Sequence, residues 1–352
     1  MRQPSSSRAA LGWLLLCSLV LGCAGGPPVL PASHSFGRMA MGTVLEITLL
    51  GADPRQARAA ADAAFAEVAE LENLASRHDP GSQLSALNAA AGGAPQPVDP
   101  RLHALIRRSV ELAALTEGSF DVTVGPIVEL WIEAARSDRV PSPQEIETAL
   151  ARTGASRIAL EPERVGLPLP GMSLDLGGIA KGHALDAVAE RLRVAGHRDA
   201  LLHFGRSSVQ ALGRAPDGGG WRLLLPALDA GDDAVLTLSD RALSVSSSLG
   251  QWSEIGGRRF GHVVDPRTGS ALVELRRSAV VAPDATLAEA LSTALTILDV
   301  EAGLALVEAQ PGVEARIEDG SGVLGTSSGW HRLSGATAPE RRDRAHTLRS
   351  GA

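Results

Sequence analysis

The chain has 352 residues, of which 44% are hydrophobic and 21% charged, and this length and composition are typical of one large or two modest globular domains. The net charge of −7 argues against a nucleic-acid-binding surface. The aromatic content of 3%, without any tyrosine, argues against stacking platforms for single strands, so we expect no nucleic-acid partner.

The amino-terminal residues have the organisation of a secretory signal. Two arginines precede an apolar run over residues 11–22, which is too short to span a bilayer comfortably. The run ends in Val-Leu-Gly-Cys, which looks like a bacterial lipobox, so residues 1–22 are expected to be a lipoprotein signal peptide and Cys23 to be lipidated. A plain signal peptide cut near Ala24 is the alternative. The lipidated protein would face the periplasm from the bacterial cell envelope, anchored to a membrane without spanning it.

Cysteine chemistry is excluded in the processed chain, because the only other cysteine, Cys17, lies inside the signal peptide. The next stretch, 23–35, is rich in proline, glycine and serine, which is typical of a tether. The last residues, 334–352, are polar and are expected to be a disordered tail. The globular domain is therefore expected over residues 36–333.

Helices and strands are predicted from apolar periodicity and from cap residues. Strands and helices are mixed without strict alternation, which indicates an α+β fold. Residues 127–135 are apolar enough to belong to the core. Strands are predicted at 44–49, 157–160, 200–204, 221–225, 235–239, 243–247, 260–264, 276–282 and 313–318. Helices are predicted at 54–76, 99–116, 144–152, 286–298 and 301–309, the first four capped by Asp53, Asp99, Ser142 and Asp284.

A glycine-rich stretch from Asp175 to Asp186 leads into an apolar-periodic segment, 184–192, that is predicted to be helical. The first turn of such a helix presents free backbone N–H groups and the positive end of the helix dipole, which favours an anion. Lys181 lies in this stretch and is the only lysine of the chain. Because Arg and Lys are not interchangeable at a phosphate or proton-transfer site, its retention points to chemistry. An ordinary loop with a chance lysine is the alternative.

Four further stretches carry polar residues that suit a reactive site. Together with 175–186, in this order and spacing, they resemble the ApbE family of FAD:protein FMN transferases over about residues 36–333. Each motif alone is weak, but five in order, with Asp-Pro-Arg-Thr-Gly intact, are specific. The four stretches are Met41–Thr43, Gly118–Pro126, Gly261–Gly269 and Ala288–Ala294.

The resemblance implies an ApbE-like, T-fold-related α+β architecture of two packed subdomains with FAD between them. It implies a Mg²⁺-dependent enzyme that splits FAD, releases AMP and attaches FMN through a phosphoester to a Thr or Ser of a target flavoprotein. Two alternatives stay open. A FAD-binding lipoprotein without transferase activity would retain FAD and release no AMP. A FAD pyrophosphatase would release AMP and free FMN without an acceptor.

A metal site is predicted on the helix over residues 286–298. Glu289 and Thr293 are four residues apart, so their oxygens face one side of the helix, and oxygen ligands suit Mg²⁺. By resemblance, the backbone carbonyl of Ala180 completes the set. Family members usually carry Asp where this chain has Glu289, and a solvated helix surface is the alternative for this residue.

His262 is the predicted general base. The ordinary pKa of imidazole, near 6.5, suits proton abstraction at neutral pH, and the family's equivalent histidine is assigned that role. A strand histidine taken alone is more often structural. Lys181 is the second residue assigned to catalysis.

The resemblance also implies a set of flavin- and phosphate-binding residues. Met41 would lie against the isoalloxazine, unless it is plain core. His78 stands where the family often has a tyrosine that stacks on flavin, and an imidazole buries less area. Ser119, Phe120 and Asp121 would line the flavin or ribityl side. The remaining members of the predicted set are Asp175, Gly177, His183 and Val264.

The chain departs from the family pattern after residue 204. Family members usually carry two glycines there, whereas this chain has Gly205 followed by Arg206, and a bulky residue does not adopt positive φ cheaply. The Ser-Ser-Ser-Leu-Gly segment at 246–250 departs mildly. Together with Glu289, these differences leave open whether catalysis is weakened or altered.

Overall fold

The computed structural model describes residues 31–205, 207–228 and 233–334, which belong to one compact unit. The predicted signal peptide, Cys23 and most of the predicted tether lie outside these residues, as does Arg206. Among the helices of the described part, none combines the length and apolarity needed to cross a membrane.

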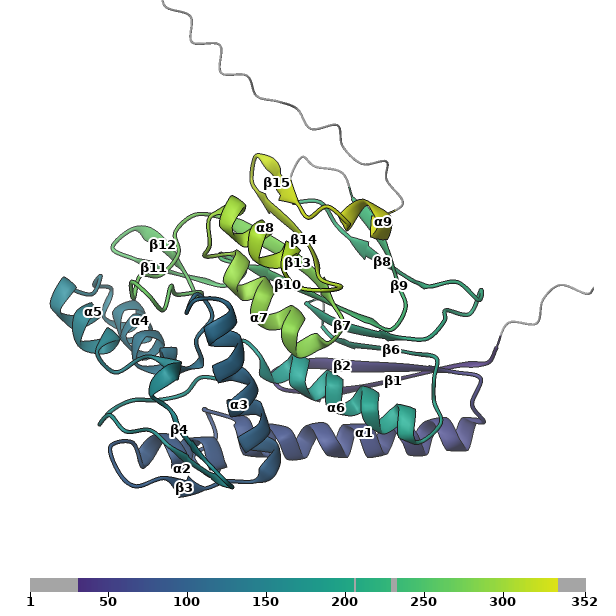
Figure 1. Cartoon of the computed structure of the whole chain (residues 1–352), viewed down its shortest axis with the longest axis horizontal. Helices are drawn as coiled ribbons and strands as arrows, with labels where there is room; N and C mark the ends of the chain where they lie inside the picture. The colour runs from purple at the N-terminus through teal and green to yellow at the C-terminus, as the bar shows by residue number, and fades with distance from the viewer. Residues whose placement is uncertain (1–30, 206, 229–232, 335–352) are drawn as a thin grey trace, which may run out of the picture. The chain divides into compact units, whose positions relative to one another are not determined.

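An eight-stranded sheet forms the centre of this unit (Figure 1). All neighbouring strands pair antiparallel. Side chains alternate between the two faces, so Ala242 and Val280 belong to one core whereas Leu243 and Val281 belong to another. In sheet order, the strands are β1 (Ser33–Ala40), β2 (Thr43–Leu50), β6 (Ala200–Phe204), β7 (Ser208–Leu212), β10 (Arg241–Ser247), β13 (Arg276–Ala282), β14 (Glu314–Asp319) and β15 (Gly322–Thr326).

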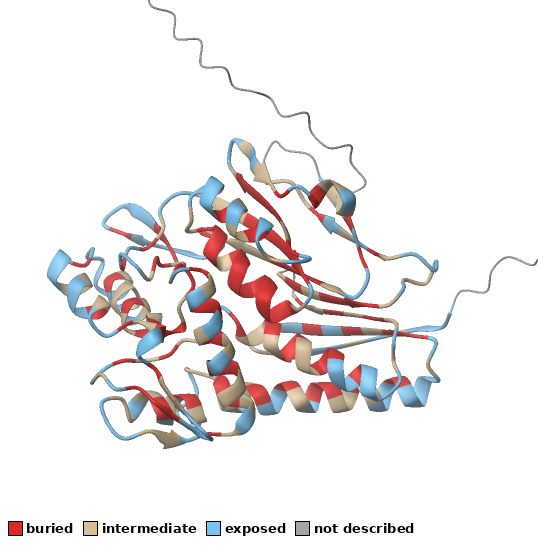
Figure 2. Ribbon diagram, viewed as in Figure 1, coloured by how far each residue is buried: buried red, intermediate tan, exposed pale blue. Residues whose placement is uncertain are grey.

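Helices cover one face of the sheet and form the main core with it. Helix α7 packs on β10 and β13, α6 packs on α7, and α1 packs on α6 and β1. Helix α7 is buried on nearly every side, as Figure 2 shows, because α6, α8 and the sheet surround it. The four helices are α1 (Pro54–Ala75), α6 (Ala180–Val194), α7 (Ala285–Leu295) and α8 (Val300–Glu308).

The opposite face of the sheet is covered by a hairpin and the last described helix. Trp221, Leu236 and Trp330 from these elements pack against Leu50 and Val281 of the sheet in a second core. The covering elements are β8 (Trp221–Leu225), β9 (Ala234–Leu238) and α9 (Trp330–Ser334).

The segment between α1 and α6 supplies the remaining helices and a small sheet, and the chain after β10 adds the β11–β12 hairpin. Helices α4 and α5 pack on the β11–β12 hairpin through a third core, to which Ile127, Ala149, Ile255 and Phe260 belong. In chain order, these elements are α2 (Gln83–Ala89), β3 (Gln96–Pro97), α3 (Pro100–Leu115), the 3₁₀ turn Val122–Val124, α4 (Gly125–Ser137), α5 (Pro143–Leu150), the 3₁₀ turn Ala155–Arg157, β4 (Ala159–Glu161), β5 (Arg164–Gly166), β11 (Trp252–Ile255) and β12 (Arg258–Gly261).

The predicted α+β class and the four predicted helix caps are confirmed. The Asp53 and Asp99 carboxylates accept hydrogen bonds from first-turn amides of α1 and α3. Ser142 forms a reciprocal capping box with Glu145, and Asp284 accepts a hydrogen bond from an amide of α7. These signals were readable because a cap needs only residues within one turn.

The predicted ends of the domain need correction. The tether was expected to reach residue 35, but β1 already begins at Ser33, because Ser33 to Ala40 pair along their whole length with β2. The tail was expected from residue 334, which instead ends α9. Residues 335–352 lie outside the described part.

Several strand predictions were incomplete. The strand expected at 260–264 is β12 and ends at Gly261, because the Gly261 amide turns to donate to the carbonyl of Leu272. The strand expected at 157–160 begins later, after a 3₁₀ turn. Six strands were not predicted at all, namely β1, β3, β5, β7, β11 and β15. The apolar run 127–135 lies in α4, where Ile127 and Ala134 are buried and Trp131 is half-buried.

Candidate active site

Three of the five motifs meet where α6 begins and α7 passes beside it. A β-carbon at Gly178 would lie 3.5 Å from Cε2 of Phe120 and 3.9 Å from Oγ1 of Thr293. The Lys181 ammonium lies 3.3 Å from Oε1 of Glu289. The glycine-rich stretch thus contributes Gly178 and Lys181 to this place. The Gly118–Pro126 motif contributes Phe120, and α7 contributes Glu289 and Thr293.

The Met41–Thr43 motif lies against Gly205, which precedes Ser208 by three residues. Met41 and Gly42 form the two-residue turn between β1 and β2, with φ of 47° and 75°, as a tight hairpin turn requires. The Gly205 amide donates to the carbonyl of Val44 at 2.8 Å, and a β-carbon at Gly205 would lie 2.7 Å from Oγ1 of Thr43. Met41 is half-buried and packs against the main core, so its contact with a flavin stays a prediction.

The Gly261–Gly269 motif lies against the Gly118–Pro126 motif. A β-carbon at Gly118 would lie 3.9 Å from Cγ of Arg267, and the Trp131 indole donates to the carbonyl of Gly269 at 2.9 Å. Asp265 holds the turn by accepting hydrogen bonds from the backbone and side chain of Arg267. Val264, from the predicted flavin set, is buried in the third core. Contacts therefore link four of the five motifs, all but Met41–Thr43.

The Glu289 side chain is buried and contacts three polar groups. It is only 3% exposed, so the solvated-surface alternative is wrong. Its Oε1 accepts from the Ser208 hydroxyl at 2.5 Å and pairs with Lys181, while Oε2 accepts from the Gly182 amide at 2.8 Å. A buried carboxylate is costly unless it is paired and hydrogen-bonded, and here both oxygens have partners. The first turn of α6 supplies two of those partners and adds the positive end of its dipole.

The close approach of α6 and α7 brings Lys181 within reach of Glu289. A β-carbon at Gly182 would lie 2.4 Å from the carbonyl oxygen of Ala285, which is closer than atoms pack. Glycine at this position therefore sets the distance between the two helices, and with it the distance from Lys181 to Glu289.

The predicted metal ligands fit Mg²⁺ by the chemistry of their donors. Glu289, Thr293 and Ala180 would supply a carboxylate, a hydroxyl and a carbonyl, and Mg²⁺ takes few protein ligands of this kind. Within the described ranges, no group of three or more His, Cys, Asp or Glu side chains could hold a metal. Lys181 already pairs with Glu289, so a cation would share that carboxylate with the ammonium.

His262 follows β12 and is exposed. Its backbone amide and its Nδ1 lie 3.1 Å and 3.0 Å from the carbonyl oxygen of Gln251. A carbonyl can only accept, so the Nδ1 contact requires the proton on Nδ1 and leaves Nε2 as the free acceptor of the neutral ring. This is the tautomer that a general base needs.

The carboxylate that opens the glycine-rich stretch has a partner that sequence reasoning missed. Asp175 pairs with the Arg77 guanidinium at 2.8 Å and accepts a hydrogen bond from the Gly177 amide at 2.9 Å. Arg77 also reaches Glu129 on α4 at 3.3 Å. Residues 77 and 175 are far apart in sequence, so no local pattern could have indicated the pair. The neighbouring His78 has an exposed side chain.

Two predicted flavin-side residues hold their own loop. The buried Ser119 hydroxyl donates to the carbonyl of Thr116 at 2.7 Å. Asp121 accepts from the amide and hydroxyl of Thr123 through one oxygen and from the Ala155 amide through the other. Their contact with a cofactor therefore stays a prediction. His183, on α6, is half-buried, and burial lowers its pKa, which favours the neutral ring.

Two serines of β10, of which Ser246 belongs to the segment that departs from the family pattern, join the sheet to α7. The hydroxyls of Ser244 and Ser246 on β10 lie 2.9 Å and 2.8 Å from the Ser292 hydroxyl. Ser248 accepts from the Arg276 amide and donates to a loop carbonyl. The segment at 246–250 thus has a packing role beside the site.

Asp186 closes the glycine-rich stretch and holds the start of α7. Its carboxylate accepts from the amides of Ala285 and Thr286 at 2.8 Å and 2.9 Å, and from the Thr286 hydroxyl at 2.5 Å. Burial nevertheless raises its pKa to about 6 from an ordinary value of 3.8, against the opposing effect of these hydrogen bonds.

We expect Asp186→Asn to remove one component of the pH dependence of stability. The folded state keeps the Asp186 proton up to about pH 6, whereas the unfolded chain releases it near 3.8, so this component is fully present below about pH 4 and is lost as the pH rises to 6. The loss is at most about 3 kcal/mol. Denaturant unfolding of both proteins from pH 4 to 7 would test it, and identical pH profiles would contradict it.

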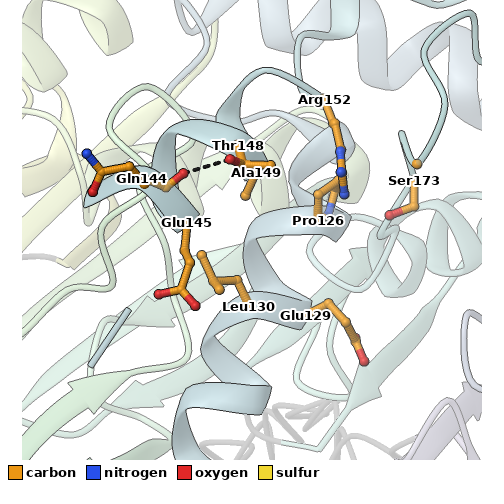
Figure 3. Close-up of a pocket in the computed structure, with 10 residues that line it drawn as sticks. Pro126, Glu129, Leu130, Gln144, Glu145, Thr148, Ala149, Arg152 and Ser173 are labelled. Atoms are coloured by element: carbon orange, nitrogen blue, oxygen red, sulfur yellow. Dashed lines mark hydrogen bonds between the residues drawn. The ribbon is translucent and has the colours of Figure 1, made fainter. Parts of the chain in front are cut away.

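A groove lies beside the site and includes Pro126, the last residue of the Gly118–Pro126 motif. It has a volume of about 550 Å³ and lies along α4 and α5. Figure 3 shows Glu129 and Leu130 of α4 on one side, Gln144 and Glu145 of α5 on another, and Ser173 across from them. None of the predicted site residues lines it, and its connection to the site runs through the Glu129–Arg77 pair.

Comparisons with known proteins agree with the arrangement of the motifs. The ApbE family model matches residues 41–317 of the chain. The FAD:protein FMN transferase of Treponema pallidum is 31% identical over 333 residues, which cover 86% of this chain and 89% of the relative. The FAD:protein FMN transferase of Vibrio cholerae is 30% identical over 246 residues, which cover 68% and 73%. The apo structure of the Pseudomonas stutzeri flavinyl transferase ApbE has a TM-score of 0.77 at 27% identity and covers 89% of this chain and 100% of that one. The chain therefore belongs to the ApbE family.

Proposed function

We propose that this chain is an enzyme that transfers FMN from FAD to a Thr or Ser hydroxyl of a target flavoprotein and releases AMP. Family membership supports the reaction class, since curated relatives are named FAD:protein FMN transferases. The observation that carries the proposal is the buried Glu289, held by Lys181, Ser208 and the first turn of α6. A carboxylate, an ammonium and the positive end of a helix dipole at one place suit a pyrophosphate and its counter-cation.

The proposed reaction exchanges one phosphorus–oxygen bond for another. The acceptor oxygen attacks the phosphorus of the FMN half, the bond to the bridging oxygen breaks, and AMP leaves with that oxygen. The acceptor proton passes to Nε2 of His262, which the Gln251 carbonyl leaves free. Lys181 and the positive end of the α6 dipole would stabilise the charge on the phosphate oxygens.

Magnesium, when bound, would neutralise charge on the pyrophosphate. Glu289, Thr293 and the carbonyl of Ala180 would hold it. Glu289 has one methylene more than the usual Asp, and its contacts to Ser208 and Gly182 orient that longer side chain. The replacement of the usual Asp by Glu289 is therefore accompanied by contacts that orient the longer side chain.

One incubation tests this proposal against its alternatives. The chain is mixed with FAD, Mg²⁺ and an acceptor domain that carries a flavinylation threonine. The transferase yields AMP and a covalently fluorescent acceptor, which loses its fluorescence on replacement of that threonine by alanine. AMP with free FMN would indicate a FAD pyrophosphatase, and FAD retention without AMP would indicate a binding protein.

We also propose that the protein is anchored to a membrane of the bacterial cell envelope through Cys23 and faces the periplasm. The support is the short apolar run that ends at this cysteine. Cys23→Ser should leave the precursor unprocessed by lipoprotein signal peptidase, as a higher mass on intact-protein mass spectrometry. Cys17→Ser is the matched control and should mature normally. Normal maturation of Cys23→Ser would rule out the anchor.

A further inference from the structure

The β11–β12 hairpin has one face in the third core and one face outward. In its register Trp252 lies opposite Gly261 and Glu254 opposite Arg259. Side chains alternate along a strand, so Ile255 and Phe260, which are buried, mark the inner face, and Trp252 and Arg259 belong to the other. The hairpin therefore holds an indole and a guanidinium where the core does not need them.

The outward pair is exposed and already stacked. Trp252 is 46% exposed, and the guanidinium carbon of Arg259 lies 4.4 Å from the centroid of its ring. Stacking on the indole holds the guanidinium in place while its N–H edge remains free to bind an acceptor.

The hairpin carries a net positive charge. Glu254, the only acidic residue of the two strands, lies opposite Arg259 on the outward face, and Arg258 is the second arginine. Neither arginine takes part in an ion pair among the described residues. The Arg259 guanidinium can therefore bind a further carboxylate while the indole packs on apolar atoms of a partner.

The hairpin that carries this face leads directly into His262. The residue before Trp252 is Gln251, whose carbonyl receives both the amide and Nδ1 of His262. Trp252 in turn lies opposite Gly261, the residue before His262, and directly opposed residues are about 4.5–5.5 Å apart. Val273, 44% exposed, follows the residue that pairs with Gly261 and adds apolar surface. Any protein segment that brings a hydroxyl to His262 comes within reach of this face.

We propose that Trp252 and Arg259 form the docking surface for the acceptor flavoprotein, which places a carboxylate on the Arg259 guanidinium and apolar atoms on the indole beside the acceptor hydroxyl. This rests on the proposed function. Trp and Arg are the residues that most often dominate binding energy at protein interfaces. Because neither Trp252 nor Arg259 belongs to the predicted flavin-binding set, this surface contributes to recognition of the acceptor and not of FAD.

The test compares Trp252→Ala and Arg259→Glu with the wild-type protein. The acceptor domain is titrated, binding is measured by calorimetry, and the KM values for acceptor and for FAD are measured in parallel. We expect each variant to weaken acceptor binding and raise its KM at least about tenfold, as hot-spot truncation does, with the KM for FAD unchanged. Trp252→Phe and Arg259→Lys should recover part of the loss. Leu224→Ala and Arg222→Glu, at exposed positions of β8 on the opposite face of the sheet, are the matched controls.

The outcomes separate this inference from the proposed function. Unchanged acceptor binding in both variants, or a wild-type protein that does not bind the acceptor, would overturn the docking surface. A wild-type protein that binds the acceptor but never forms the flavin bond would refute the proposed function, and the binding comparison would still decide the docking surface. An equal loss in the control variants would show a general charge or stability effect and would also overturn it.

Discussion

Replacing His262 with alanine should lower the rate of FMN transfer about 10²–10⁴-fold, the usual loss on removal of a general base, and leave FAD affinity unchanged. The side chain is exposed and contacts a backbone carbonyl through Nδ1, so its loss leaves no hole in a core. Initial rates of acceptor flavinylation and FAD titration by flavin fluorescence would measure the two quantities separately. Added imidazole should restore part of the rate, because the site is open to solvent.

His78→Ala is the complementary variant for this prediction. The exposed His78 is predicted to contact flavin, so its loss should weaken FAD binding more than it slows the chemical step. If His262→Ala instead lost FAD affinity and rate in equal measure, and imidazole restored nothing, the histidine would be structural.

Glu289→Ala should abolish Mg²⁺-dependent AMP release and also destabilise the fold. The substitution removes the predicted metal ligand and leaves the Ser208 hydroxyl, the Gly182 amide and the Lys181 ammonium without their shared acceptor. Breaking a buried ion pair from one side costs about 3–5 kcal/mol. Glu289→Asp should keep or raise the activity, because the family usually has Asp at this position.

Glu289→Gln separates the two effects of that prediction. The amide keeps the volume and one acceptor but loses the charge, so the variant should be more stable than Glu289→Ala and bind metal poorly. Calorimetric titration with Mn²⁺, denaturant unfolding and AMP release would be measured on all three variants. Full activity with normal metal dependence in Glu289→Ala would mean that the metal assignment is wrong.

The parts of this fold that could be predicted depend on residues close in sequence. The Ser142 and Asp53 caps lie within single turns, and both were predicted, although the reciprocal bond between Glu145 and Ser142 was not. Strand β1, which begins at Ser33, was not predicted, because its only signal is the pairing with β2. Strand β7 was missed because Ser208 and Gln210 interrupt its apolar pattern, although both are buried.

The same distinction holds at the site. The motifs identified Lys181, Glu289 and His262 as residue types suited to the chemistry, and the structure brings Lys181 and Glu289 together. The partners that orient them were not readable. Ser208 lies 81 positions from Glu289, and Arg77 lies 98 positions from Asp175. Such pairs arise from the packing of the whole sheet and its helices, and no local pattern encodes them.

The contact between Gly182 and Ala285 has a consequence for how the glycine-rich stretch should be interpreted in other chains. Any side chain at position 182 would push α6 and α7 apart by roughly 1 Å, since atoms pack at about 3.5–4.0 Å. Lys181 would move away from Glu289 with α6, although neither residue had changed. The glycine acts as a spacer, so its replacement in a relative would indicate a lost ion pair even where every charged residue of the motif is still present.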